Sequence, residues 1–157
     1  MAHKKGASST RNGRHSNSQR LREVGIWEPF ETSLVLRLLR PGAVFVDVGA
    51  NIGYFSLLAS RLVGPAGTVL AFEPEAANFA LLEANCRLNG CANIRCFQAA
   101  LGEENARGTI YINELNRGDH SLYPTEPGRT GQGISIINGS RFVGAIHPRV
   151  NCIKIDT

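Results

Sequence analysis

Two nearly continuous runs of apolar residues, each closed by a polar turn, most constrain what this chain can fold into. The first run spans residues 43–48 and the second spans residues 68–72, and both contain β-branched residues. Runs of this kind are typical of strands that are covered on both faces, as the strands of parallel sheets are. Residues 52–63 between them have the spacing of a helix. The sequence therefore predicts a βαβ unit with a right-handed crossover.

Further elements are expected on both sides of this unit. A helix should run from Pro29 to just before Pro41, another should lie around residues 77–88, and a third strand is expected at 94–98. Alternating strands and helices with short connections predict an α/β fold, a parallel sheet with flanking helices. The apolar stripes that should face the sheet are Phe30, Leu34, Leu38 and Leu39 in the first helix and Ala77, Leu81, Ala84 and Leu88 in the other.

The order of elements is less regular after residue 98. Residues 109–112 and 134–137 are possible short strands, and residues 113–133, with four Gly and two Pro, are expected to form a long loop. Loops of that length are more often functional than not. A last buried strand is expected at 152–156, with an acid at its carboxyl end.

The positive charge of the chain is confined to its first residues. The formal net charge of +4 suggests a nucleic-acid partner, but residues 1–22 hold six of the 17 Lys and Arg residues and no acid. That leaves 11 basic against 13 acidic residues in 23–157. The arm has too few apolar residues to offset the entropy of ordering, so it is expected to be disordered. We therefore predict a basic arm at 1–22 and one folded domain at 23–157.

Targeting signals and metal-binding spacings are not found in the sequence. No apolar stretch approaches the ~18 residues of a membrane helix, and the first 20 residues lack the apolar run of a signal peptide. Cys86, Cys91, Cys96 and Cys152 have neither C-x-x-C spacing nor the pattern of a small disulfide scaffold. We therefore expect a cytoplasmic protein with free thiols, no membrane contact and no metal site.

Polar residues and glycines follow the first two predicted strands, where parallel α/β sheets bind their ligands. Asp47 is followed by Gly49, Asn51 and Gly53, and the second strand ends in Glu73. Glycines let the backbone turn sharply and approach a ligand closely, and the N-terminus of the next helix favours an anionic group. A carboxylate at the end of the second strand can accept hydrogen bonds from both hydroxyls of a ribose. Together these residues predict a site for an adenosine-type ligand.

The third predicted strand ends in Gln98 and Ala99, beside which an adenine ring could lie. Spacing alone leaves both NAD and S-adenosylmethionine open as the ligand. The acid at Glu73 disfavours a dinucleotide with a 2′-phosphate, and the lack of G-x-G-x-x-G at 49–54 counts against NAD.

Three blocks, VFVDVGANIGYFS at 44–56, VLAFEP at 69–74 and IKID at 153–156, occur in this order. They resemble the FkbM family of S-adenosylmethionine-dependent methyltransferases, and the likeness extends over residues 23–157. The resemblance implies a Rossmann-like class I methyltransferase fold, with S-adenosylmethionine as the cofactor. It also implies site roles: Gly49, Asn51 and Gly53 around the methionine moiety, Asp47 supporting their loop, and Glu73 on the ribose.

The same resemblance implies O-methylation of a hydroxyl on a small molecule or glycan. Methyl transfer from a sulfonium is an in-line displacement, so the enzyme must hold the acceptor oxygen against the methyl group and remove its proton. Asp156 stands where family members carry an acid beside the methyl group, and His120 is a second candidate base. The alternatives are a helix-capping acid at Asp156 and a merely exposed histidine at His120.

The family pattern continues beyond the strand at Ile153 with a glycine, an acid and further strands and helices, whereas this sequence stops at Thr157. We therefore expect a partial domain, incomplete at its C-terminus, in which residues 153–156 form an unprotected sheet edge. Activity could be lost by such a truncation.

Residues 1–21 resemble the N-terminal arm of bacterial large-subunit ribosomal protein twenty-seven. That extension contacts ribosomal RNA, so the likeness implies either a fused reading frame or an arm that binds RNA phosphates with little sequence preference. The alternative function is therefore a ribosomal or RNA-binding protein with a non-catalytic Rossmann-like body.

Overall fold

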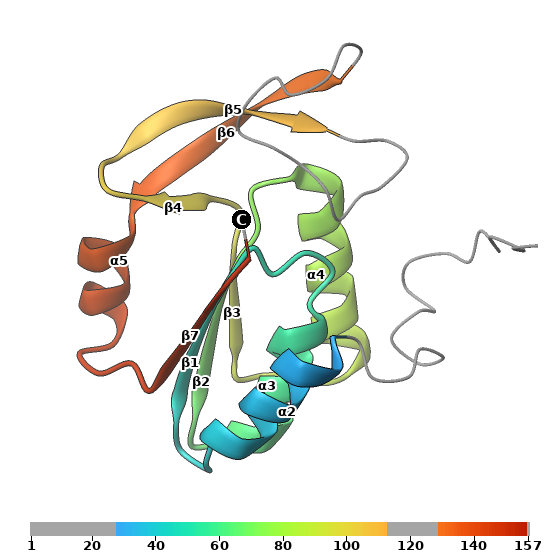
Figure 1. Ribbon diagram of the computed structural model, residues 1–157, viewed down its shortest axis with the longest axis vertical. Helices are drawn as coiled ribbons and strands as arrows, with labels where there is room; N and C mark the ends of the chain where they lie inside the picture. The colour runs from blue at the N-terminus through green and yellow to red at the C-terminus, as the bar shows by residue number, and fades with distance from the viewer. Residues whose placement is uncertain (1–27, 113–128, 157) are drawn as a thin grey trace, which may run out of the picture.

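The computed structural model describes residues 28–112 and 129–156 of the chain. Its centre is a four-stranded sheet in the order β3-β2-β1-β7, in which all neighbouring strands are parallel (Figure 1). This order is that of one half of a Rossmann-like sheet, so the predicted α/β fold with a parallel sheet is confirmed. The strands are β1 (Val44–Val48), β2 (Thr68–Phe72), β3 (Ile94–Phe97) and β7 (Cys152–Ile155).

Helices cover both faces of this sheet, with α2 (Pro29–Leu38), α3 (Tyr54–Val63) and α4 (Ala76–Leu88) on one side and α5 (Gly139–Ile146) on the other (Figure 1). Phe45 and Val69 point to the side of α2 and α3, whereas Val46 and Leu70 point to the side of α5, where they meet Val143. The alternation follows from the period of two along a strand. No described helix is long and apolar enough to cross a bilayer.

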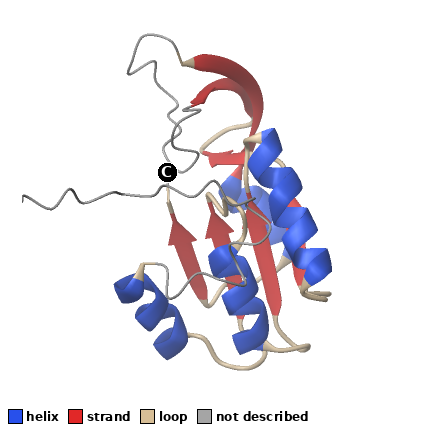
Figure 2. Cartoon of the chain, turned by 90° about the vertical axis from the view of Figure 1, so that its right-hand side faces the viewer, coloured by secondary structure: helices blue, strands red, loops and turns tan. Residues whose placement is uncertain are grey.

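A second, smaller sheet lies above the carboxyl ends of the first, toward which the strand arrows point (Figure 2). Its order is β4-β6-β5, with β4 parallel and β5 antiparallel to β6. It therefore borders the edge at which parallel α/β sheets bind ligands. The strands are β4 (Ala100–Gly102), β5 (Ala106–Ile112) and β6 (Thr130–Asn138).

The structure corrects the expectations for the region after residue 98. The predicted strands at 109–112 and 134–137 exist but are longer, and β6 begins inside the predicted loop at 113–133. Helix α5 was missed because two glycines lie within its eight residues. The Asn138 side chain accepts a hydrogen bond from the Arg141 N–H at its start, which is a capping signal that the sequence does carry.

Of the apolar stripe predicted for α2, Leu39 is buried as expected, whereas Phe30, Leu34 and Leu38 are exposed. The buried residues here are Thr32, Val35 and, just after the helix, Leu39, whereas Phe30 is 69% exposed and Leu38 is 62% exposed. Helix α2 leans against α3 with a polar contact, since the Thr32 hydroxyl lies 3.3 Å from a tyrosine hydroxyl at the start of α3. Apart from Leu39, the stripe chosen by hydropathy alone therefore points away from the core.

The predicted stripe of α4 is also wrong. Its buried residues are Asn78, Leu82, Asn85 and Cys86, whereas Leu88 is 69% exposed. Hydropathy misplaces the stripe because two of the four buried residues, Asn78 and Asn85, are polar. Such side chains are buried only when they find hydrogen-bond partners in the fold, as Asn85 does below.

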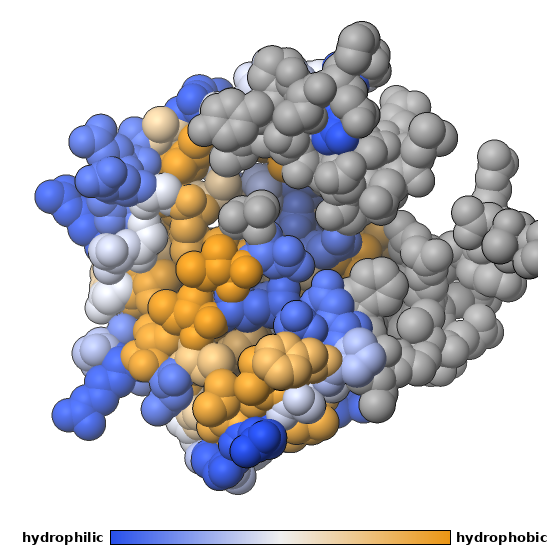
Figure 3. Space-filling model, viewed as in Figure 1, coloured by the Kyte–Doolittle hydropathy of each residue, from blue (hydrophilic) through white to orange (hydrophobic). Residues whose placement is uncertain are grey.

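Strand β7 forms one edge of the four-stranded sheet, where the sequence predicted an unprotected edge. Ile153 and Ile155 are 54% and 68% exposed. An apolar groove of about 550 Å³ lies between this strand and α5, with Val46, Val48 and Val143 among its lining residues. Figure 3 shows apolar surface in this part of the molecule.

The junction between β1 and β7 can be tested with two glycines of similar backbone conformation. Gly49 (φ 76°) and Gly42 (φ 82°) are both left-handed, so alanine at either costs ~1–2 kcal/mol. A Cβ at Gly49 would also lie 2.0 Å from the Asp156 carbonyl oxygen, whereas nothing lies within 4 Å of one at Gly42. In urea unfolding, Gly49→Ala should lower the free energy of unfolding by ~1–3 kcal/mol more than Gly42→Ala. Equal losses would show that β7 does not pack against this turn.

Candidate functional site

The site is built around the turn that joins β1 to α3. Gly49, Asn51 and Gly53 all have positive φ angles, of 76°, 51° and 95°. The N–H groups of Gly49 and Ala50 both donate to the Phe72 carbonyl at the end of β2, at 3.0 and 2.9 Å. The turn is therefore fixed against the carboxyl end of the neighbouring strand, with Asn taking the left-handed position that it tolerates better than most residues.

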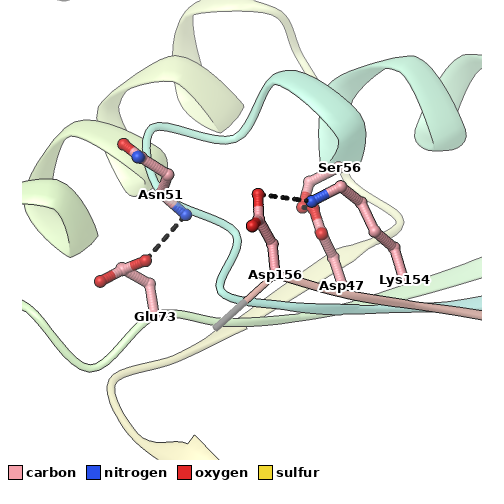
Figure 4. Close-up of polar contacts among 6 residues, drawn as sticks. All are labelled: Asp47, Asn51, Ser56, Glu73, Lys154 and Asp156. Atoms are coloured by element: carbon pink, nitrogen blue, oxygen red, sulfur yellow. Dashed lines mark hydrogen bonds and ion pairs between the residues drawn. The ribbon is translucent and has the colours of Figure 1, made fainter. Parts of the chain in front are cut away.

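Glu73 holds this turn to the turn that follows β2. Its carboxylate accepts a hydrogen bond from the Asn51 N–H at 2.8 Å (Figure 4). It accepts another from the Glu75 N–H at 2.9 Å. The side chain is buried, and this burial raises its pKa from 4.5 to about 7, against the opposing effect of the two N–H donors. A carboxylate has about four acceptor positions, so two remain for other donors.

Asp47 lies in the interior beside this turn and ties β1 to α3. One carboxylate oxygen accepts a 2.6 Å hydrogen bond from the Ser56 hydroxyl, and the other is buried with no hydrogen-bond partner among the described residues. Burial raises the pKa of Asp47 from 3.8 to about 6, while the Ser56 hydrogen bond and the nearby Lys154 lower it.

Asp156 and Lys154 come from β7 and its carboxyl end. The parallel register places Lys154 opposite Asp47, and its ammonium pairs with the Asp156 carboxylate at 3.0 Å (Figure 4). The same ammonium lies 4.6 Å from the centre of the Phe55 ring, as in a cation–π contact. The Asp156 side chain is 62% exposed, so its carboxylate faces solvent at the edge of the site. Sequence reasoning missed Lys154, although a lysine inside an apolar strand was a visible signal.

Helix α4 supports the turn from the other side. The Asn85 amide donates to the Ile52 carbonyl at 2.8 Å, and the Leu82 side chain fills the space in which a Cβ on Gly53 would lie, 2.6 Å from its Cδ1. Sequence reasoning missed both residues. An asparagine in the interior of a helix was the available signal, since such residues are otherwise neutral to unfavourable there.

The remaining predicted site residues are Gln98, Ala99 and His120. Gln98 is exposed and lines a cavity of about 280 Å³ between the carboxyl ends of β2 and β3 and the small sheet, with Pro74 and Arg107. Ala99 is buried and does not line that cavity. His120 lies outside the described residues. Among those that are described, no three His, Cys, Asp or Glu side chains could together hold a metal ion.

Comparison with known protein families identifies the family to which this chain belongs. Residues 47–157 match the model of the family described as Methyltransferase FkbM domain. The chain belongs to the FkbM methyltransferase family. The family match begins after the predicted arm at 1–22, and the ribosomal resemblance of that arm stays a prediction.

Curated relatives match parts of this FkbM domain. It is 50% identical over 66 residues to the 31-O-demethyl-FK506 methyltransferase FkbM of Streptomyces tacrolimicus, covering 42% of this chain and 25% of the relative. It is 36% identical over 78 residues to Methyltransferase 1 of Beauveria bassiana, covering 50% and 31%. The chain thus spans about a quarter to a third of the length of these curated relatives.

Solved structures show more distant likeness. A SAM-dependent methyltransferase from Aquifex aeolicus aligns with a TM-score of 0.42 and 19% identity, covering 58% of this chain and 45% of that chain. A precorrin-6y C5,15-methyltransferase from Geobacter metallireducens aligns with a TM-score of 0.42 and 24% identity, covering 47% and 40%.

The buried carboxyls predict an unusual dependence of stability on pH. Because burial raises the pKa values of Asp47 and Glu73, the folded chain keeps protons that the unfolded chain releases from about pH 4 upward. Their contribution to stability is therefore complete below about pH 4 and is lost as the pH rises through about 6 and 7. For Asp47 alone, the rise from 3.8 to about 6 corresponds to about 3 kcal/mol.

Urea unfolding at pH 5 and pH 8 measures this dependence. Asp47→Asn should reduce the loss of unfolding free energy between these two pH values, because the amide does not ionise. The control Glu104→Gln, at an exposed carboxyl, should leave the loss as in the wild type. An unchanged pH dependence in Asp47→Asn would contradict a protonated Asp47 in the folded state.

Proposed function

We propose that this FkbM domain binds S-adenosylmethionine at the carboxyl edge of its parallel sheet and methylates a hydroxyl group of a small molecule or glycan in the cytoplasm. The observation that carries the proposal is the pairing of the turn after β1 with Glu73 at the end of β2, through the 2.8 Å hydrogen bond from Asn51. In an FkbM-family chain, this pairing places a glycine-rich turn and a carboxylate on adjacent strands.

The residues at this edge fit the parts of S-adenosylmethionine. The turn of Gly49, Asn51 and Gly53 can take the methionine moiety, because positive φ angles bring the backbone itself to the surface of the turn. The two unused acceptor positions of Glu73 suit the two hydroxyls of a ribose, and the cavity beside Gln98 suits an adenine ring. Asp47 acts indirectly, by holding α3 to β1 beneath the turn.

The acceptor would lie between the turn and the exposed carboxylate of Asp156. When bound, S-adenosylmethionine supplies an activated methyl group on a sulfonium. The protein has to orient the acceptor hydroxyl and take its proton, and Asp156 can do both. Lys154 holds the carboxylate in one position through their 3.0 Å ion pair. His120 is a second candidate base.

The name of the Streptomyces relative, an O-demethyl-FK506 methyltransferase, supports a hydroxyl as the acceptor. The alternative function is RNA binding through the six positive charges of residues 1–22, with a non-catalytic body. That alternative predicts binding that weakens steeply with salt and does not require the turn at Gly49.

Isothermal titration calorimetry on the full chain separates these functions. S-adenosylmethionine should bind at one site per chain, and NAD should not. At pH 8, above the raised pKa of Glu73, Glu73→Gln should weaken the binding of S-adenosylmethionine by ~10-fold, because a charged acceptor is lost. The matched control Glu83→Gln, on the exposed side of α4, should bind like the wild type. A folded chain that binds RNA in a salt-dependent manner but not S-adenosylmethionine would refute the methyltransferase proposal.

The role of Asp156 is tested by methyl transfer to a panel of hydroxylated small molecules and saccharides, followed as S-adenosylhomocysteine formation. Asp156→Asn should slow transfer by ~10²-fold or more, because the amide cannot take the proton. The affinity for S-adenosylmethionine should change less than about twofold, since Asp156 touches the acceptor. If Asp156→Asn transfers the methyl group at the wild-type rate, Asp156 is not the base and another residue takes the proton.

A further inference from the structure

Two cysteines from different elements face each other beside the candidate site. The Sγ atoms of Cys86 in α4 and Cys96 in β3 lie 3.8 Å apart. A disulfide bond joins sulfur atoms at about 2.05 Å, so a small approach of the two side chains would allow one to form. Cys86 is 8% exposed, and Cys96 is half-buried on an edge strand, where a small oxidant can reach it.

The two thiols differ in acidity. The pKa of Cys96 is lowered chiefly by its hydrogen bond with Cys86, against the raising effects of burial and of Glu83. The pKa of Cys86 is raised by the same hydrogen bond, by burial and by the nearby Cys91. Cys96 is also the more exposed of the two thiols, so it is the one that an oxidant reaches first, and thiolates are the nucleophiles in disulfide exchange.

The pair lies next to the contact through which α4 supports the turn after β1. Asn85, the neighbour of Cys86 in the chain, donates to the Ile52 carbonyl at 2.8 Å. One turn earlier in the helix, Leu82 packs against Gly53. Strand β3 lies at the far edge of the sheet, two strands away from β1. A bond between α4 and β3 would therefore draw the helix away from the turn.

We propose that Cys86 and Cys96 form a reversible disulfide that loosens the support of α4 for the turn at 49–53. The oxidant is a low-molecular-weight disulfide such as glutathione disulfide. The Cys96 thiolate attacks one sulfur of this disulfide and releases one glutathione as thiolate. Cys86 then attacks the Cys96 sulfur of the mixed disulfide, passes its proton to that thiolate, and expels the second glutathione. Two protein thiols are oxidised and one disulfide is reduced to two thiols.

The chemistry is tested on the native chain with glutathione disulfide. Titration of thiols after denaturation should give two per chain instead of the four in the sequence, and dithiothreitol should restore four. Peptide mapping should join the peptides that contain Cys86 and Cys96. A chain that keeps four thiols, or a bridge that involves Cys91 or Cys152, would overturn the proposal.

Serine variants show the order of attack. Cys91→Ser should still lose two thiols, which makes it the matched control. Cys86→Ser should stop at the first step and carry one glutathione on Cys96. Cys96→Ser should form no intramolecular bridge and react slowly, since Cys86 is buried. Equal glutathione addition to both variants would show two independent thiols.

The effect on the turn rests on the proposed function and is measured separately, as the affinity of the Cys91→Ser variant for S-adenosylmethionine. The oxidised form should bind about threefold or more weakly than the reduced form, because the Asn85 hydrogen bond is lengthened. Equal affinities would overturn the coupling. If the reduced form does not bind at all, the proposed function fails, while the thiol titration still decides whether the disulfide exists.

Discussion

The Glu73 carboxylate is the interaction on which the site depends. It accepts one hydrogen bond from the turn after β1 and one from the turn after β2, so a single side chain fixes the starts of both α3 and α4. Without it, two N–H groups next to the interior would lose their partner, at ~1–3 kcal/mol each. The paired donation of Gly49 and Ala50 to the Phe72 carbonyl completes this junction. The carboxyl edge is thereby rigid before any ligand arrives, which is what binding without further ordering requires.

Fixing the turns in this way buries two carboxyl groups, which lowers the stability of the fold. Asp47 and Glu73 both lie in the interior, where burial raises the pKa of each, and the charge of Asp47 raises the pKa of Glu73 further. Among the described residues, Lys154 offers an opposing charge to Asp47. An apolar residue at either position would avoid the cost of burying a carboxyl group, but it could not hold Ser56 or Asn51. Polar groups that weaken a core while positioning a site are expected at functional positions.

The sequence predicted those parts of the fold that depend on local pattern. Strands β1 and β2 followed from uninterrupted apolar runs, and the positions of Gly49, Asn51, Gly53 and Glu73 followed from where those runs end. Apart from Leu39, the stripes of α2 and α4 were predicted wrongly because Thr32 and Asn85 are buried through partners in distant segments. Lys154 could not be placed either, since its position opposite Asp47 depends on the register of β7 against β1. Hydropathy contains no information about such pairings, which only the assembled sheet creates.

At this edge, the parts proposed for the cofactor and the part that could shape the acceptor site come from different segments of the chain. Residues 44–98 supply both turns, Glu73 and Gln98, so the parts proposed for the cofactor come from one continuous βαβαβ segment. The small sheet is inserted between β3 and β7 and closes the cavity beside Gln98 from above, through residues of β5 and β6. Because those strands make no hydrogen-bonded pairing with the four-stranded sheet, their sequence can vary without disturbing the two turns. The insertion is therefore the part of the described chain in which differences in acceptor shape can be accommodated while the cofactor site stays the same.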